Sequence, residues 1–305
     1  MERGYRVRRS CLAVPASSER FIEKARGLPA DEVFLDLEDA VAPAAKAQAR
    51  ANAVTALAGD WGGRLVAVRV NDAATQWAHR DVLDVVSGGR AEVIILPKVT
   101  SPDHVVWLDL LLGQVEREAG LPAGRTGIEV QIEDARGLAA VNAIAAASSR
   151  LEALVFGPAD FMASVGIRSL EVGSQPDGYV GGDAYHYPLM RILIAARSRG
   201  VAAIDGPYLK IRDADGLRRS AASAAALGYD GKWVLHPDQI EAANQAFAPS
   251  GADYARAVRI IEAYSHATDV QARGAVMLGE EMIDEASRKM AEAVVARGNA
   301  AGFAR

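Results

Sequence analysis

Cysteine is almost absent from this chain of 305 residues, since Cys11 is the only one. A disulfide within the chain is therefore impossible, and a thiolate cage around a metal is not expected. Cys11 stands in a short apolar run, which predicts a small core residue rather than a nucleophile. Aromatic residues make up only 6% of a chain that is 50% hydrophobic. This composition is typical of a globular protein with an aliphatic core.

Positive charge is also in short supply. The chain has 34 Lys and Arg against 39 Asp and Glu, which gives a net charge of −5. We therefore expect no nucleic acid partner and no binding to an anionic membrane. No run approaches the roughly 18 apolar residues of a membrane-spanning helix, and the apolar segment 11–16 is too short and proline-broken for a signal peptide. These absences predict a cytoplasmic protein in which any anionic ligand meets a local basic cluster.

Several common functional motifs are missing. The glycine-rich stretches 88–89 and 178–182 lack the spacing of a P-loop or of a dinucleotide fingerprint, and no GxSxG nucleophile elbow occurs. Four of the five histidines fall in no metal-ligand spacing, namely His79, His104, His186 and His266. A nucleotide cradle of these kinds and a histidine-based metal site are not supported.

Short β-branched runs alternate with longer helical patterns, as in βα units around a parallel sheet. Eight runs qualify as strands, at 10–14, 32–36, 65–70, 92–96, 127–132, 153–156, 201–204 and 232–235. Helices are predicted at 18–25, 46–58, 79–86, 103–119, 135–146, 188–198, 215–227 and 239–247. Eight such units over about 240 residues predict a (β/α)8 TIM barrel within residues 1–247. A doubly wound sheet is the alternative.

Two segments do not fit a minimal barrel. Residues 161–187 are rich in Gly and Ser and long for a βα loop, which usually marks an active-site element. The sequence Ala-Pro-Ser-Gly at 248–251 interrupts the chain before a helix at 252–267 and a final segment at 276–305. We therefore predict that residues 248–305 form a C-terminal helical arm or lid.

Polar residues gather where the predicted strands end. In a (β/α)8 barrel these positions face one shared site, so a polar residue there carries functional weight. They are Asp36, Glu38 and Asp39, then Arg69 and Asn71, then Lys98, Glu133, Asp134, Asp160, Asp205 and His236.

Glu133 and Asp160 end adjacent strands, which would bring two carboxylates together. Two carboxylates completed by water and substrate oxygens are a usual way to hold Mg²⁺. The alternative for each residue is to cap the helix that follows it. Both together, opposite an arginine at the third strand, favour the metal.

Arg69 leaves a buried apolar strand, where an unpaired guanidinium would be very costly. We expect an ion pair with Glu38 or Asp39, and a purely structural pair is the alternative. The same pair would orient Arg69 to stabilise negative charge on a substrate oxygen. All three residues are therefore candidate catalytic residues. His236 is a candidate base, with a hydrogen-bonded structural role equally open.

Four ordered segments, at 34–43, 68–71, 157–161 and 231–237, carry a resemblance to a known family. They read FLDLEDAVAP, VRVN, GPADF and GKWVLHP. In them the chain resembles the citrate lyase beta subunit-like proteins, which include the malyl-CoA/β-methylmalyl-CoA lyases and citramalyl-CoA lyases, within the HpcH/HpaI aldolase/citrate lyase superfamily. The resemblance spans nearly the whole chain.

The resemblance implies a Mg²⁺-dependent barrel with a C-terminal lid, assembled as a homotrimer or hexamer. It makes Glu133 and Asp160 the metal ligands, and Arg69 the group that contacts the reacting carbonyl, with Ala159 joining them in substrate binding. The segment 278–284 is similar to a lid motif that reaches a neighbouring subunit, which nominates Asp284 as acid/base. Contacts to coenzyme A are implied for Lys24, Lys46, Arg50 and His236.

The chain departs from the family near the first strand, where Pro15-Ala16 and Ser18 replace Pro-Gly and a following Arg. The loss of that Arg alters the expected contacts to CoA phosphates. Related pyruvate aldolases carry a histidine base after the second strand. The loop 40–46 contains none, which disfavours that reaction.

The reaction implied is cleavage or formation of a carbon–carbon bond in a 3-hydroxyacyl-CoA, with acetyl-CoA or propionyl-CoA and a small 2-oxo acid as partners. A malyl-CoA thioesterase is one alternative. A citrate lyase beta-type subunit that acts on an acyl-carrier partner is another.

Overall fold

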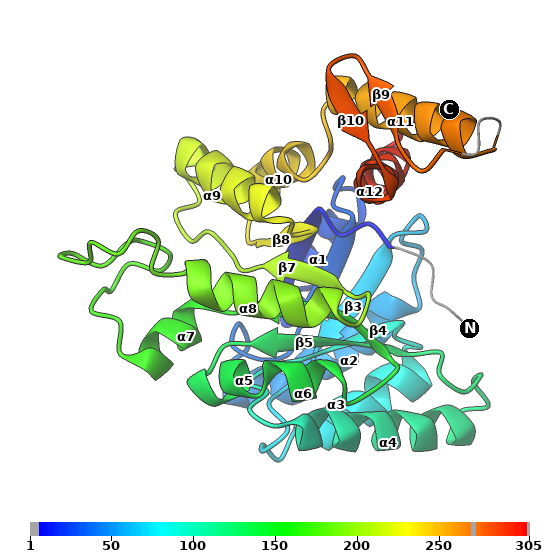
Figure 1. Cartoon of the computed structure of the whole chain (residues 1–305). Helices are drawn as coiled ribbons and strands as arrows, with labels where there is room; N and C mark the ends of the chain where they lie inside the picture. The colour runs from blue at the N-terminus through cyan, green and yellow to red at the C-terminus, as the bar shows by residue number, and fades with distance from the viewer. Residues whose placement is uncertain (1–5, 270–272, 304–305) are drawn as a thin grey trace. The chain divides into compact units, whose positions relative to one another are not determined.

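The structure, a computed structural model, describes residues 6–269 and 273–303 (Figure 1). Eight parallel strands form a closed barrel in chain order, with β1 hydrogen-bonded to β8. They are β1 (Ser10–Pro15), β2 (Glu32–Asp36), β3 (Leu65–Arg69), β4 (Val93–Leu96), β5 (Gly127–Ile132), β6 (Leu151–Phe156), β7 (Ala202–Asp205) and β8 (Gly231–Val234). The predicted (β/α)8 barrel is confirmed, and the doubly wound alternative is wrong.

Helices follow the strands as the periodicity predicts. They are α1 (Glu19–Arg26), α2 (Lys46–Leu57), α3 (Ala78–Leu83), α4 (Pro102–Glu118), α5 (Ala135–Ala139), α6 (Val141–Ala145), α7 (Pro158–Val165), α8 (His186–Arg197), α9 (Ala214–Leu227) and α10 (Ile240–Ala246). Short helical turns lie at Pro43–Ala45, Asp84–Gly88 and Pro237–Gln239.

Two predicted helices are corrected. The helix expected at 135–146 is two short helices that meet at Ala140, whose φ of −93° and ψ of 4° are not helical. The helix expected at 79–86 passes into a π turn at Asp84–Gly88. This turn packs closely on α2, because a Cβ on Gly89 would come within 2.6 Å of Leu57 Cδ1.

Inward-facing side chains fill the barrel beneath its carboxyl end. Cys11, Phe34, Ile95 and Val155 are fully buried there, and Trp233 is nearly so. The rings of Phe34 and Trp233 lie 4.4 Å apart between centroids. Cys11 is thus a core residue, as predicted, and burial raises the pKa of its thiol.

An ionic cluster closes the opposite, amino-terminal end of the barrel. The guanidinium of Arg8 donates to Glu32 at 3.0 Å, to Glu129 at 2.7 Å and to Glu152 at 2.5 Å. Arg8 is only 3% exposed, and Glu32 and Glu129 are fully buried. One cation thus faces three buried carboxyl groups. Burial and the Glu129 charge raise the pKa of Glu32 well above its usual value.

Gly231 lies at the seam where β8 meets β1. A Cβ on this residue would collide with the backbone carbonyl of Arg8. The backbone ahead of β1 can cross the start of β8 because residue 231 has no side chain.

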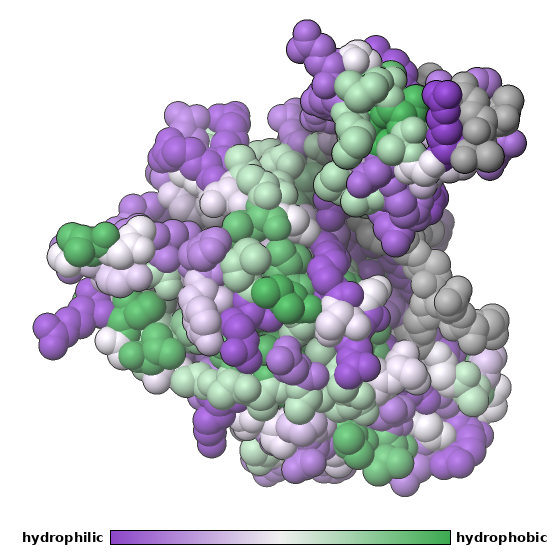
Figure 2. Space-filling view, in the orientation of Figure 1, coloured by the Kyte–Doolittle hydropathy of each residue, from purple (hydrophilic) through white to green (hydrophobic). Residues whose placement is uncertain are grey.

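A long segment between α7 and α8, residues 166–185, contains no helix or strand. Leu170, Tyr179 and Val180 in it are largely exposed. Figure 2 shows hydrophobic side chains at the tip of this loop, on the left of the view.

The chain divides into two compact units, and the first, Arg8–Asn244, holds the complete barrel. The second contains the described residues from Gln245 onward. Its main elements are α11 (Gly251–Asp269), an antiparallel hairpin of β9 (Val276–Leu278) and β10 (Glu281–Ile283), and α12 (Glu285–Ala300). The boundary predicted from the sequence lies at 247/248, and the hairpin, whose turn contains Gly279 at φ +64°, was not predicted.

Within residues 6–269 and 273–303, none of the helices has the length and apolar character needed to cross a membrane.

Candidate active site

Arg69 and Asp36 form an ion pair at the carboxyl ends of β3 and β2. Arg69 Nε lies 2.8 Å from Asp36 Oδ1, and Nη2 lies 2.6 Å from Oδ2. The guanidinium lies 5.3 Å above the ring of Trp233 and 5.9 Å from that of Phe34. A planar guanidinium that donates two hydrogen bonds to one carboxylate and lies over two aromatic rings has little freedom to reorient.

Glu38 and Asp39 approach the same guanidinium from the loop after β2. Arg69 Nη1 lies 3.3 Å from Glu38 Oε2 and 3.8 Å from Asp39 Oδ2. The expected pairing with these residues is therefore present, but Asp36 is the nearer partner. Burial raises the pKa of Glu38 to about 7. Burial alone would raise the pKa of Asp39. The hydrogen bonds that Asp39 makes with Glu38 and Lys98 outweigh burial, so its pKa lies below the usual value.

Lys98 connects this group to Glu133. Its ammonium donates to Glu38 and lies 3.0 Å from Asp39 Oδ1. Its backbone N–H donates to Glu133 Oε1 at 2.7 Å. The four consecutive strands β2, β3, β4 and β5 thereby contribute to one connected network.

Glu133 is almost fully buried, with 2% of its surface exposed. Its second oxygen accepts a hydrogen bond from the side chain of Gln131. Gly157, at the end of β6, leaves the room for this carboxylate, because a Cβ there would lie 2.5 Å from Glu133 Oε2. Burial raises the pKa of Glu133 to about 8, and the nearby charge of Asp160 contributes to the rise.

Asp160 lies in the first turn of α7, half-buried, directly after the end of β6. Ala159 precedes it in the same turn and is exposed. The backbone N–H groups of a first helical turn have no partner within their helix, so they can bind an anionic oxygen. The structure thus brings Arg69, Glu133 and Asp160 to one end of the barrel, with Ala159 beside Asp160.

Carboxyl groups outnumber cations around Arg69 and Glu133. Five carboxyl groups meet three cations, which leaves two negative charges when all are ionised. The carboxyl groups are Asp36, Glu38, Asp39, Glu133 and Asp160, and the cations are Arg69, Lys98 and Lys46.

These residues fit a divalent cation. Carboxylate oxygens are the donors that Mg²⁺ prefers, and Mg²⁺ usually keeps waters or substrate oxygens for its other positions. A buried Glu133 that retains a proton near neutral pH would be held ionised by such a cation. Among the described residues no group of three or more His, Cys, Asp or Glu is placed to enclose a metal. The site would therefore take two protein carboxylates, from Glu133 and Asp160.

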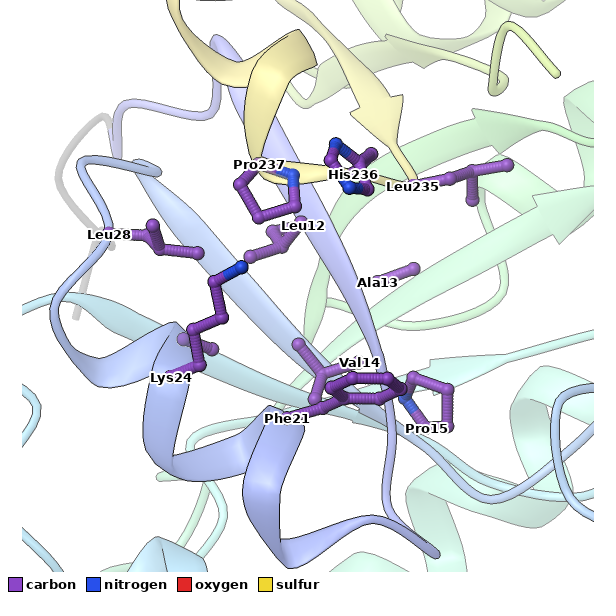
Figure 3. A pocket seen from close by; sticks show the side chains of 11 residues that line it. Leu12, Ala13, Val14, Pro15, Phe21, Lys24, Leu28, Leu235, His236 and Pro237 are labelled. Carbon is purple, nitrogen blue, oxygen red and sulfur yellow. The ribbon is translucent and has the colours of Figure 1, made fainter. Parts of the chain in front are cut away.

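A separate cavity of about 250 Å³ lies between β1, α1 and the end of β8 (Figure 3). Lys24 extends into it from α1, and His236 and Pro237 line its other side. Lys24 is exposed and has no ion-pair partner in the part of the chain that the structure describes. Ser18, at the position where the resemblance implied an arginine, accepts a hydrogen bond from the backbone N–H of Phe21 and caps α1.

Lys46 and Arg50, expected at CoA phosphates, are committed to internal partners. Lys46 is buried and donates to the carbonyl oxygens of Leu37 and Glu38 at 2.9 and 2.8 Å. Arg50 Nε lies 2.7 Å from the buried Asp81. Of the four residues expected at CoA, Lys24 and His236 are the two that line the cavity.

Asp284 lies in the C-terminal unit, where it caps α12. Its carboxylate accepts hydrogen bonds from the backbone N–H and the hydroxyl of Ser287, at 3.0 and 3.1 Å. These bonds lower the pKa of Asp284, so the carboxyl is ionised.

No role in the site was predicted from the sequence for three residues of the network: Asp36, Lys98 and Gln131. Asp36 and Lys98 are among the polar residues noted at strand ends, but without a role in the site. Gln131 gives no such signal, because it lies within β5 and only the inward alternation of that strand places it beside Glu133.

Comparison with known proteins agrees with this geometry. Residues 9–237 match the model of the HpcH/HpaI aldolase/citrate lyase family. The chain is 38% identical to an L-malyl-CoA/beta-methylmalyl-CoA lyase of Cereibacter sphaeroides, over 95% of this chain and 94% of the relative. It is 37% identical to a (3S)-malyl-CoA thioesterase of the same species, over 85% of this chain and 84% of the relative.

A solved structure gives the same result. The protein CitE of Mycobacterium tuberculosis, crystallised with magnesium, acetoacetate and coenzyme A, superposes with a TM-score of 0.75 at 30% identity, covering 95% of this chain and 97% of that one. The family model and the relatives each cover most of the chain, and the resemblance noted in the sequence is confirmed. The chain belongs to the HpcH/HpaI aldolase/citrate lyase family.

Proposed function

We propose that this protein is a Mg²⁺-dependent carbon–carbon lyase that acts on a 3-hydroxyacyl-CoA. Malyl-CoA would give acetyl-CoA and glyoxylate, β-methylmalyl-CoA would give propionyl-CoA and glyoxylate, and citramalyl-CoA would give acetyl-CoA and pyruvate. The reverse condensation uses the same site. The observation that carries the proposal is the network joining Arg69 to Glu133 through Lys98, beside Asp160.

Glu133 and Asp160 would hold the cation. Lewis-acid activation of the carboxylate and hydroxyl oxygens that become the 2-oxo acid is what a bound Mg²⁺ would supply. The amide of Ala159 would donate to the same carboxylate.

Arg69 would stabilise the thioester enolate that forms when the carbon–carbon bond breaks. The bond breaks with its electron pair left on the carbon next to the thioester, and negative charge develops on the thioester oxygen. A guanidinium already fixed by Asp36 does not have to reorganise as this charge appears, which is the basis of electrostatic catalysis.

Asp284 would move the proton at the enolate carbon: in cleavage it would take up, through water, the proton that the substrate hydroxyl loses and deliver it to that carbon, and in condensation it would remove the proton. The ionised carboxylate at the start of α12 is the form needed to remove that proton. We infer that it acts in the site of a neighbouring subunit, within a homotrimer or hexamer. Lys24 and His236 would contact the CoA portion of the substrate from their cavity.

The test is a panel of malyl-, β-methylmalyl- and citramalyl-CoA, each incubated with purified protein and Mg²⁺. Chromatography of the products should show acetyl-CoA or propionyl-CoA together with one equivalent of 2-oxo acid. The absence of both products with all three substrates would sink the proposal.

Thioester hydrolysis is the second candidate, because one similar protein is a malyl-CoA thioesterase. Free CoA and malate without acetyl-CoA would identify it. A subunit that requires an acyl-carrier partner is the third candidate, and turnover of free acyl-CoA by the isolated chain argues against it.

A further inference from the structure

Lys98 has an unusual backbone for its residue type. Its φ of +53° lies in the left-handed region, which only one other non-glycine residue among those described, Arg90, adopts. A side chain with a Cβ is disfavoured there, and such strain persists where the surroundings enforce it, often at functional sites. Lys98 follows Pro97 at the end of β4 and is half-buried.

The backbone of Lys98 contacts Glu133, the proposed metal ligand. Its N–H reaches Glu133 Oε1 at 2.7 Å, while Gln131 holds the other oxygen. A carboxylate that accepts one hydrogen bond on each oxygen has a fixed plane. This fixes how Glu133 is presented to a cation.

The side chain of Lys98 contacts the carboxylates on the Arg69 side of the site. Its ammonium contacts Glu38 and Asp39, and both of these carboxylates approach Arg69 Nη1. Lys98 therefore offsets part of the negative charge of the two carboxylates next to the Arg69 guanidinium. It also connects the loop after β2 with the end of β5.

We propose that Lys98 is a positioning residue that fixes the metal carboxylate and the catalytic guanidinium relative to each other. The left-handed backbone turns the N–H toward Glu133 while the side chain reaches Glu38 and Asp39. This inference rests on the proposed function, since it assigns Glu133 to Mg²⁺ and Arg69 to the enolate.

Two substitutions separate the backbone from the side chain. Lys98→Gly and Lys98→Val both remove the ammonium, but glycine accepts a positive φ and a β-branched residue does not. Any difference between the two in metal binding therefore reports the N–H contact to Glu133. Lys98→Arg keeps the positive charge and tests rescue.

The readouts are the Kd for Mg²⁺ alone, by isothermal titration calorimetry without substrate, and kcat at saturating Mg²⁺. Supporting carboxylates and hydrogen bonds around a metal typically change affinity or activity by about 10- to 100-fold. We expect Lys98→Gly to keep the Mg²⁺ affinity within about twofold and to lose about 10-fold or more in kcat. Lys98→Val should lose about 10-fold in Mg²⁺ affinity as well, and Lys98→Arg should recover most of kcat.

Wild-type kcat in Lys98→Gly, or equal Mg²⁺ affinities for the glycine and valine variants, would overturn the inference. If the valine variant does not fold, Lys98→Ala replaces it, since alanine also has a Cβ. A wild-type protein that binds no Mg²⁺ and cleaves no acyl-CoA overturns the proposed function and this inference together. A fully active wild type whose variants do not separate overturns only the inference.

Discussion

Asp36 and Arg69 are register partners on β2 and β3, and their side chains are joined by two hydrogen bonds of 2.8 and 2.6 Å. The two residues that are neighbours in the β2–β3 register are thus also the two that form the ion pair of the site. A one-residue slip between these strands would turn one of the two side chains to the other face of the sheet. The register of the barrel and the orientation of the guanidinium are fixed together.

Replacing Arg69 with lysine keeps the charge but not the forked geometry. A lysine ammonium cannot make both bonds to Asp36 and still present a donor in the same plane. We expect kcat to fall by about 10²- to 10³-fold, the usual loss for one transition-state donor. Arg218→Lys, at an exposed arginine of α9, is the control and should retain wild-type kcat. Comparable kcat values for the two variants would remove Arg69 from the reaction.

Removing one proposed metal ligand should abolish the response to Mg²⁺. A ligand that binds only the folded protein at 100 times its Kd adds about 2.7 kcal/mol of stability. The wild-type melting temperature should therefore rise with Mg²⁺, and that of Asp160→Asn should not. Cleavage of malyl-CoA, followed by glyoxylate release, should be lost in the same variant. Asp215→Asn, at an exposed carboxylate of α9, should behave as wild type, and full activity in Asp160→Asn would contradict the metal assignment.

Asp284 combines a structural and a proposed catalytic role that two substitutions can separate. Asn is as good a helix cap as Asp, so Asp284→Asn keeps the cap and loses the carboxylate. Ser287→Ala keeps the carboxylate and loses the reciprocal part of the cap. We expect kcat to fall by about 10²- to 10⁴-fold in the first variant, the range for a general acid or base. The second should retain near-normal kcat with a lower melting temperature.

If the lid acts between subunits, mixing Arg69→Lys with Asp284→Asn after subunit exchange should restore part of the activity. A mixed oligomer would contain sites with an intact Arg69 from one chain and an intact Asp284 from the other. No recovery in demonstrably mixed oligomers would place both residues of a site on one chain.

The cluster at the amino-terminal end of the barrel predicts a pH-dependent stability. The pKa of Glu32 is raised in the folded protein, so the folded state holds a proton that the unfolded state releases above the ordinary glutamate pKa of about 4.3. Stability from this group is complete below that pH and is lost as the pH rises through the raised pKa, by up to about 1.4 kcal/mol per pH unit.

Glu32→Gln imitates the protonated form and leaves Glu129 and Glu152 to pair with Arg8. Its melting temperature should match the wild type near pH 5 and exceed it near pH 8. A uniform loss of stability at both pH values would show instead that Glu32 is needed as a carboxylate. Urea titrations at the two pH values give the corresponding free energies of unfolding.

The strands were the most predictable part of the molecule. Buried parallel strands are continuous apolar runs, and the limits expected for the second and fifth agree with β2 and β5 residue for residue. The break of 135–146 at Ala140 was not predictable, because alanine favours helix and the break comes from local backbone geometry. The β9–β10 hairpin was missed because each strand has only three residues.

For the site, the sequence indicated which residues stand at strand ends but not how they pair. The preference of Arg69 for Asp36 over Glu38 depends on the β2–β3 register. The pairing of Lys46 and Arg50 with internal partners depends on how α2 packs, whereas a charged residue on an outer helix of a barrel is expected to be exposed. The contact of the Lys98 backbone with Glu133 depends on a positive φ, which cannot be predicted from the presence of a lysine.

Gly231 connects the packing at the barrel seam with the ionisation of the buried carboxyl groups around Arg8. A side chain at this position would displace the Arg8 backbone, and with it the guanidinium that donates to Glu32, Glu129 and Glu152. Glu32 and Glu129 are fully buried, and without that guanidinium their protonated forms would be favoured. A larger residue at 231 would therefore weaken the barrel at every pH, and more near neutral pH than in mild acid, where the buried acids can hold a proton.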